Sequence, residues 1–561
     1  MKKILSILLA VVLVGIFTTS CIEQYDPEGY RTDSDKVLIT INQASNAPGS
    51  YDNFVSATTS TLCGQFTYSG SKHYPHDFGY PSFFLQRDVM GQDIVANGNN
   101  NWYGTWYSCG TGLGPTYATS QIPWTYYYGW IKNCNNVLSL AGEEPSADKV
   151  TGAGIAHTMR AMFYMDLARM YAQKTYAADK SAETVPIVTQ TTSLADLAKN
   201  PRATNEAMWT LILSDLDAAE TQLANYKRDN VYTPDLSVVY GLKARAYLTM
   251  EDWANAQKYA KMAQSGYTLL TDAQYNDRTT GFNSPNNSWM FACTFKSDDP
   301  NILENDADSS WGSIMISEVA ASGCGYSANY GQNMLIDRHL YETIPATDFR
   351  KKAFIDFSLD NMGKKEQIAA LAAYTDDAEG MFQTGQNAAS KTVGGITVKF
   401  RPNNGEHKNQ QIAFTVAVPL MRVEEMYLIE AEAAGMQNES AGISLLTTFA
   451  QTRDSDYKYG THGSEAYYNS STSSFQNEVW WQRRVELWGE GFATFDIKRL
   501  QKGIIRSYKD TYHVEASRWN VQSVPNWMNL CIVQTETNYN TACTNNPTPI
   551  KPTSDSEEYV W

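Results

Sequence analysis

The segment WWQRRVELWGEGFATFDIKRL, residues 480–500, concentrates side chains that could carry out acid–base chemistry. On a helix, Glu486 and Glu490 lie four residues apart on one face. A pair of carboxylates on either side of a glycosidic bond is the catalytic machinery of most glycosidases. The same two carboxylates repel each other unless cations lie beside them. The segment offers three arginines for that purpose, namely Arg483, Arg484 and Arg499.

The apolar residues of this segment favour a structural role over catalysis. They recur at helical spacing and form one stripe that faces a core, made of Trp481, Val485, Trp488 and Phe492. Glycosidase carboxylates must face an open cleft, about 5–10 Å apart. The two glutamates here lie beside the apolar stripe and amid arginines. We therefore predict a buried ionic joint, and we predict that the chain is not an enzyme.

No further motif indicates catalysis, and no complete metal site is apparent. The sequence contains no nucleophile elbow, zinc-protease helix, phosphate-binding loop or dinucleotide fingerprint. His73, His76 and Asp77 form a small cluster that lacks further ligands. The acidic stretch 297–310 alternates oxygen ligands but lacks the full calcium-loop pattern. We expect no metal and no cofactor, and a structural calcium ion in the acidic stretch is the alternative.

The elements that must position residues 480–500 show a helical pattern with small residues where helices cross. The pattern covers residues 156–173, 238–263 and 419–453, the last two with a short break in the middle. Ala244, Tyr247, Ala256 and Ala263 have the spacing of the small and aromatic positions of a tetratricopeptide unit. Ala431, Ala434, Ile443 and Ala450 repeat that spacing. A further helix is expected over 205–226, as partner of the first, with 186–204 as a long loop. The prediction is an all-α, tetratricopeptide-like helical-hairpin scaffold.

The remaining regions predict long, irregular and partly β loop insertions, which is where binding residues often lie. We expect one domain over 44–561, preceded by an anchor and tether over 21–43. Its parts are a loop-rich region 44–124, helical repeats 125–264 and 419–500, an insertion 265–418 and an extended tail 501–561. A helix is expected in SFFLQRDVMGQDIV, and strands in GGITVKF and IAFTVAVP.

The N-terminus, MKKILSILLAVVLVGIFTTSC, has the pattern of a secretory signal peptide over residues 1–20. Cys21 directly after TTS predicts lipidation of its sulfur, and simple secretion is the alternative. Loss of the leader removes two lysines and no acidic residue, so the net charge moves from −16 to −18. Such a surface repels phosphate backbones, so we expect no nucleic-acid partner. Membrane contact is expected through the lipid anchor only.

Seven cysteines follow Cys21 at wide spacing, without a CxxC pair, so the sequence predicts neither a zinc motif nor a disulfide scaffold. A Cys531–Cys543 or a Cys63–Cys109 bridge would be compatible with the sequence. The odd count leaves at least one thiol free.

The stretch RRVELWGEGFATFDIKRL resembles the C-terminal signature of the SusD/RagB family of nutrient-binding outer-membrane lipoproteins of Bacteroidetes. The matching positions are Arg483, Arg484, Glu486, Leu487, Gly489, Glu490, Gly491, Asp496 and Arg499. Gln482 and Ala493 depart from the pattern, where the family has Glu and Arg, and this weakens one ion pair. The resemblance spans nearly the whole mature chain. It implies a cell-surface lipoprotein that captures a nutrient, usually an oligosaccharide, without catalysis. It also implies a SusC-type TonB-dependent transporter as partner.

The family motifs do not contain the ligand-binding residues, so the candidates come from local chemistry. The chain has 35 Tyr and 14 Trp, and aromatic planes stack on sugar rings. A Gly/Asn-rich loop and a second loop carry aromatic residues without core periodicity, and nearby polar side chains could bind hydroxyl groups. The candidates are Trp102, Tyr103, Trp106, Tyr107, Asn101, Asp77, Arg87, Trp311, Tyr326 and Tyr330. The alternative for each aromatic residue is a place in the core of its loop.

Three other functions compete with glycan capture. A scaffold subunit that only holds the transporter would bury its loop aromatics and bind no glycan. A protein that captures a peptide or another non-glycan nutrient would have an apolar or charged pocket. A glycosidase would need two carboxylates facing a cleft.

Overall fold

The computed structural model describes residues 50–65, 74, 76–96, 101–303, 308–319, 325–388 and 390–561. Residues 52–561 form one compact unit. The predicted signal peptide, Cys21 and the tether lie outside the described residues. Within the described part, no helix is both long and apolar enough to cross a membrane.

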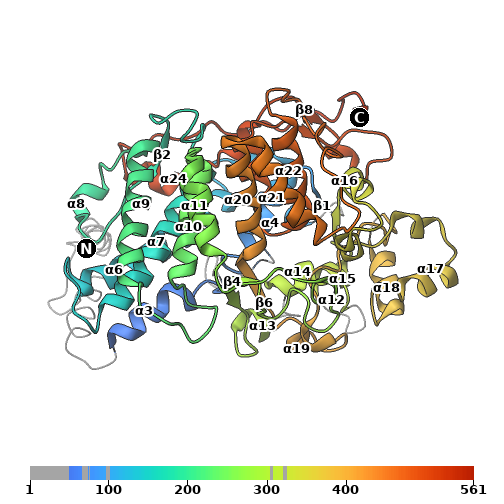
Figure 1. The fold of residues 1–561 in the computed structure, drawn as a ribbon, viewed down its shortest axis with the longest axis horizontal. Helices are drawn as coiled ribbons and strands as arrows, with labels where there is room; N and C mark the ends of the chain where they lie inside the picture. The colour runs from blue at the N-terminus through green and yellow to red at the C-terminus, as the bar shows by residue number, and fades with distance from the viewer. Residues whose placement is uncertain are drawn as a thin grey trace, which may run out of the picture. The chain divides into compact units, whose positions relative to one another are not determined.

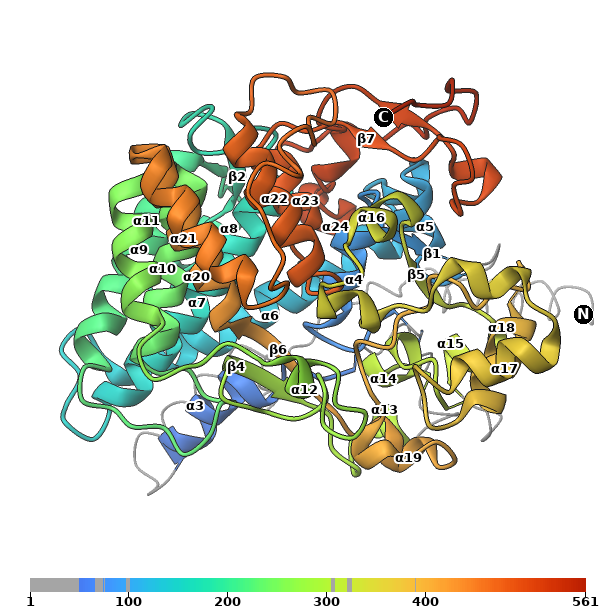
Figure 2. The ribbon, with the colours of Figure 1, turned by 45° about the vertical axis from the view of Figure 1, so that its right-hand side comes forward.

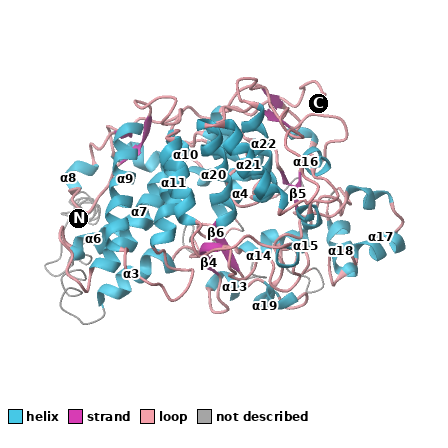
Figure 3. Ribbon diagram, viewed as in Figure 1, coloured by secondary structure: helices cyan, strands magenta, loops and turns pink. Residues whose placement is uncertain are grey.

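Antiparallel helix pairs form the scaffold of this unit, as predicted (Figure 1; Figure 3). Consecutive helices pack as α7 with α9, α10 with α11, and α20 with α21, while α11 also packs on α20. Their bounds are α7 Val150–Tyr171, α9 Asn205–Gln222, α10 Leu236–Met250, α11 Trp253–Ala263, α20 Val423–Gln437 and α21 Glu439–Gln451. The hairpins therefore stack side by side, which is the arrangement expected of helical repeats.

Local sequence signals mark the turns of the α10–α11 and α20–α21 hairpins. Glu251 adopts a left-handed conformation (φ 59°) after α10, and the Asp252 side chain then caps the N-terminus of α11. Asn438 caps α21 in the same way. Gly435 of α20 and Gly442 of α21 meet where these helices cross, because a Cβ on Gly442 would lie 2.3 Å from the Gly435 Cα. The small residues predicted at helix crossings thus permit close helix packing.

The N-terminal region contains more helix than predicted. It includes α3 (Ser50–Ser60), α5 (Gly104–Ser108) and the start of α6 (Ala118–Ala141), which packs on α7. The helix expected in SFFLQRDVMGQDIV is real but short, since α4 spans only Ser82–Val89. The long loop predicted over 186–204 contains α8 (Leu194–Leu197) and β3 (Arg202–Thr204), and β3 pairs antiparallel with β2 (Glu183–Pro186) at the start of this stretch.

Two short sheets fix the insertion to the scaffold. At its base, β4 (Trp289–Thr294) pairs antiparallel with β6 (Ala417–Arg422), so the chain leaves and returns at one place. Farther out, β1 (Ile94–Ala96) pairs with β5 (Met334–Ile336), which joins the N-terminal region to the insertion (Figure 2).

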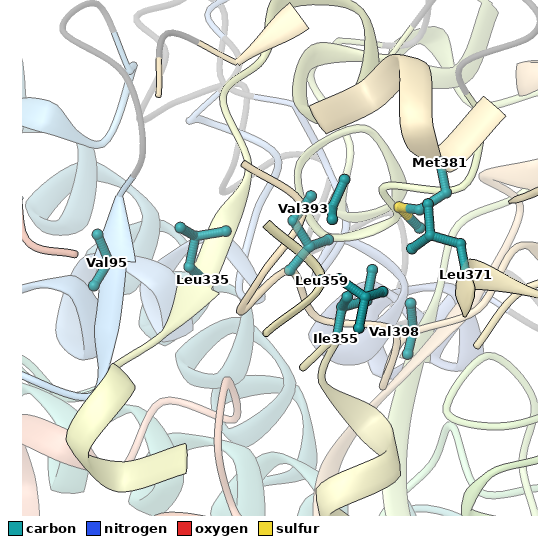
Figure 4. Close-up of a cluster of buried hydrophobic side chains, with 9 residues drawn as sticks. Val95, Leu335, Ile355, Leu359, Leu371, Met381, Val393 and Val398 are labelled. Carbon is teal, nitrogen blue, oxygen red and sulfur yellow. The ribbon is translucent and has the colours of Figure 1, made fainter. Parts of the chain in front are cut away.

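The insertion has a hydrophobic core of its own. Val95 and Leu335 of the β1–β5 sheet face a buried cluster that includes Ile355, Met381 and Val398 (Figure 4). The insertion is more helical than predicted, with α12 Asp272–Tyr275, α13 Pro300–Leu303, α14 Trp311–Met315, α15 Tyr326–Tyr330, α16 Arg338–Thr343, α17 Lys364–Leu371, α18 Ala378–Asn387 and α19 Gln410–Ala413. GGITVKF forms only isolated bridges at Ile396 and Thr397.

After the hairpins, the chain forms α22 (Ser474–Glu486) and α23 (Ala493–Arg499). The tail is mostly irregular, with β7 (Ile504–Ile505) pairing β8 (Asn520–Val521) and one short helix, α24 (Gln534–Tyr539). The disulfides considered above are not formed in the described chain. The four residues concerned are buried free thiols, namely Cys63, Cys109, Cys531 and Cys543.

Candidate functional site

Glu486 and Glu490 lie in a buried cluster of eight charged side chains, which we call the ionic joint. Its members are Asp348, Arg350, Lys399, Arg422, Glu424, Arg453, Glu486 and Glu490, and every side chain is at most 5% exposed. Four cations therefore face four carboxylates. The prediction of a structural ionic joint is confirmed for these two glutamates.

The partners of the two glutamates come from distant parts of the chain. Arg350, Arg422 and Arg453 place nitrogen atoms 3.1–3.3 Å from the Glu486 carboxylate. Lys399 lies 2.6 Å from Glu490. The joint thus connects the insertion, the α20–α21 hairpin and α22.

The electrostatics keep the two glutamates ionised. Burial alone raises the pKa of Glu486, but Arg453, Arg422 and Arg350 outweigh it and hold the pKa well below its usual range. Arg422 and Lys399 lower the pKa of Glu490 in the same way, against the effect of burial. Both carboxylates are fully engaged and neither faces a cleft, so the geometry does not fit a glycosidase pair.

The three arginines predicted as partners of these glutamates pair elsewhere, so that assignment was wrong. Arg483 binds Asp496, Arg484 binds Asp93 and Glu465, and Arg499 binds Asp496 and Glu432. The reason is geometric. The helix α22 ends at Glu486 and α23 begins at Ala493, and the connection contains Gly489 (φ 76°) and Gly491 (φ 84°), so residues 480–500 do not form one continuous helical face.

A second cluster, at the surface, has the chemistry of a ligand site, and we call it the aromatic patch. Its members are Tyr74, His76, Trp102, Tyr326 and Tyr330. The Trp102 ring centroid lies 5.1 Å from that of Tyr74 and 5.6 Å from that of His76. The Trp102 backbone N–H donates to the Tyr326 hydroxyl at 3.0 Å, and the Tyr326 ring lies 5.9 Å from that of Tyr330.

Exposure separates the members of the patch. Trp102 is 38% exposed and Tyr330 is 50% exposed, so each presents ring surface to solvent. Tyr326 is only 5% exposed, and its hydroxyl accepts the Trp102 backbone N–H. The patch is built by two regions that the β1–β5 sheet brings together, because Trp102 follows β1 and Tyr330 precedes β5.

The polar residues beside the patch lie inward. Asn101 is buried, donates to the Gln332 carbonyl at 3.2 Å and accepts the Tyr103 N–H at 2.9 Å. Burial raises the pKa of Asp77 to about 7 and lowers the pKa of His76 to about 4. Both groups therefore have a strongly reduced tendency to carry charge.

Several predicted ligand residues lie in the interior instead of on the patch. Tyr103, Trp106, Tyr107 and Trp311 are at most 3% exposed. The Tyr107 hydroxyl is 2.6 Å from the His513 ring, and the Trp311 ring packs edge-on against Phe400. In this conformation these four rings offer no face to a sugar, which is the core alternative stated above.

The Arg87 side chain is also buried. It is 3% exposed, donates to Asp166 at 3.3 Å and lies over the Phe495 ring. The sequence did not predict Tyr74 as a ligand residue, although its neighbours His73, His76 and Asp77 were considered for a metal and Asp77 for a ligand. The described residues hold no group of three or more His, Cys, Asp or Glu that could bind a metal. His73, Glu304 and Asp306 lie outside them, so the calcium alternative stays a prediction.

Comparison with known proteins gives matches along most of the chain. Residues 256–555 match the profile described as "SusD family", which is more than half of the 561 residues. Residues 87–248 match a second profile, "Starch-binding associating with outer membrane". A segment of 161 residues is 24% identical to SusD-like protein P38 of Formosa agariphila, and it spans 28% of this chain and 30% of that protein.

Solved structures share the fold. A SusD-like carbohydrate-binding protein from Bacteroides vulgatus is 22% identical with a TM-score of 0.66, over 88% of this chain and 97% of that one. A SusD superfamily protein from Bacteroides thetaiotaomicron is 18% identical with a TM-score of 0.63, over 91% and 99%. A protein described as a laminarin-binding SusD-like protein is 15% identical with a TM-score of 0.58, over 92% and 100%.

Proposed function

Because this chain belongs to the SusD family, we propose that it captures an oligosaccharide at the cell surface without catalysis. The observation that carries the proposal is the exposed ring of Trp102, with the exposed Tyr330 on the other side of Tyr326. Aromatic faces of this kind bury the apolar C–H face of a pyranose ring. The ligand would lie across the junction between the N-terminal region and the insertion.

The proposed location and partner follow from the family and from the N-terminal sequence. Proteins of this family are associated with the outer membrane. Cys21, after the signal-like leader, would carry the lipid that anchors the chain to the outer face of that membrane. A SusC-type TonB-dependent transporter would receive the captured oligosaccharide.

The test is calorimetric titration of a soluble protein spanning residues 22–561 with a panel of polysaccharides and their oligosaccharides. Laminarin belongs in the panel because one structural relative is described as binding it. Trp102→Ala should weaken binding of the responding glycan by about 1–3 kcal/mol, from lost contact area and lost ring stacking. Tyr330→Ala should also weaken it. Tyr539→Ala is the matched control, because Tyr539 is 59% exposed on α24, outside the patch.

The outcomes separate the competing functions. A glycan that binds the wild type and the Trp102→Ala variant equally well would keep glycan capture and reject the aromatic patch. No binding across the panel, with a folded protein, would favour the peptide or scaffold alternatives. Release of a shorter sugar from any substrate of the panel would reject the non-catalytic assignment.

A further inference from the structure

A pocket lined by cations lies between the helical hairpins and α23. Its volume is about 30 Å³, and we call it the arginine pocket. The cations that line it are Arg169 of α7, Arg245 of α10, Arg483 of α22, and Lys498 and Arg499 of α23. Arg245, Arg483 and Lys498 are buried, while the side chains of Arg169 and Arg499 are 11% and 8% exposed. Lys174, whose side chain is 63% exposed, lines the outer part.

The carboxylates around the pocket do not balance these cations. Arg245 has Glu425, while Arg483 and Arg499 share Asp496 and Arg499 also binds Glu432. Arg169 has only Asp166, which Arg87 shares. Among the described residues of this cluster, five arginines therefore face four carboxylates, namely Asp166, Glu425, Glu432 and Asp496.

Two neighbouring groups do not correct this imbalance. Asp88 lies near Arg87, but its oxygens accept the N–H groups of Gly491 and Ala493, and burial raises its pKa to about 7. Lys498 donates only to backbone carbonyl oxygens, those of Arg169, Ala172 and Met528. Burial, with Arg169 nearby, lowers the pKa of Lys498 to about 7.

Three of the arginines also lie against aromatic rings that line the pocket. Arg169 lies 3.7 Å over the Phe495 ring, and Arg245 and Arg483 lie 5.3 and 5.6 Å from the Phe492 ring centroid. A guanidinium group that packs its face on an aromatic ring keeps its N–H edge free for an acceptor. The Arg483 Nη1 atom is buried and has no hydrogen-bond acceptor within the described part of the chain.

We propose that the arginine pocket binds one small inorganic anion of the size of chloride or bromide. The volume is sufficient for an ion of that size. The bound ion would offset the excess charge, accept from the Arg483 edge and join α7, α10, α22 and α23. This site uses none of the residues of the aromatic patch, so it is independent of glycan capture.

The first test is crystallographic. Crystals of the 22–561 protein are soaked in sodium bromide, and anomalous differences are measured at the bromine edge. A bromide peak between Arg169, Arg483 and Lys498 is expected. A map without a peak in the pocket overturns the proposal.

The second test measures Tm in sodium chloride and in sodium gluconate at equal ionic strength. Chloride should raise Tm saturably, by about 1 °C at a tenfold excess over Kd, relative to gluconate. Lys498→Met should abolish this difference. Lys502→Met should keep it, because Lys502 is equally buried but donates to Glu465, Ala466 and Asn477 away from the pocket. Equal Tm values of the wild type in the two salts would contradict the proposal, and the bromide map decides if Lys498→Met does not fold.

Discussion

Replacing Glu486 by Gln should destabilise the protein strongly, although the change is nearly isosteric. The ionic joint contains four cations and four carboxylates, and the single carboxylate of Glu486 contacts three of the cations, Arg350, Arg422 and Arg453. The amide removes one negative charge and leaves three guanidinium groups fully buried around a neutral side chain. Removing one partner of a buried, hydrogen-bonded ion pair typically costs about 3–5 kcal/mol. We expect the free energy of unfolding to fall by that amount.

The assay is chemical denaturation of the 22–561 protein, followed by tryptophan fluorescence. Glu342→Gln is the matched control, because Glu342 pairs with Arg338 at an exposed i,i+4 position, where a pair contributes about 0.3–0.5 kcal/mol. A loss below about 1 kcal/mol for Glu486→Gln would refute the structural account of the ionic joint. Loss of glycan binding at unchanged stability would point to a functional role for Glu486 instead.

Two further predictions concern the pH dependence of stability and the packing of glycines in the helices. Arginines and Lys399 hold the pKa values of Glu486, Glu490 and Asp496 below their usual range. The stabilisation by these ionised carboxylates is therefore present above pH about 4.5 and is lost as the pH falls below about 4.5. Denaturant midpoints measured from pH 7 to pH 3 should decline steeply below pH about 4.5, and a flat profile would contradict this prediction. Gly435→Ala should destabilise the protein by about 1–3 kcal/mol, because the new Cβ would lie 2.0 Å from the Phe475 ring. In Gly129→Ala, in α6, the new Cβ meets nothing within 4 Å, so this variant should be more stable by up to about 1 kcal/mol. Thermal melts of the two variants should show Tm shifts of opposite sign.

Local sequence signals predict the helical scaffold well. Periodic alanines and capping residues such as Asp252 and Asn438 act within one turn of the chain, so α10, α11, α20 and α21 can be located from sequence. The insertion resists this reasoning because its helices are short. The core around Ile355 and Met381 joins segments that carry too few turns to show a period.

The candidate site could be predicted only in part, for two physical reasons. Trp106 lies in a helix of five residues, too short to show which face is buried, so its apolar side chains read as exposed loop residues. The partners of Glu486 are separated from it by 33 to 136 residues, and no local pattern marks them. Trp102, four residues before the buried Trp106, is exposed and donates its N–H to Tyr326, more than 200 residues away.

The signature segment also contacts the region that carries the aromatic patch, through Asp93, the residue before β1. Arg484 holds the Asp93 carboxylate with contacts of 2.6–3.0 Å, and the Trp488 indole N–H donates to the Asp93 carbonyl oxygen at 2.9 Å. The same carbonyl oxygen accepts the Asp337 N–H, where β5 ends. Asp93 therefore connects β1, which leads toward Trp102, and β5, which follows Tyr330, to the segment after α22. The signature segment thus fixes where these two strands meet, next to the region that carries the aromatic patch.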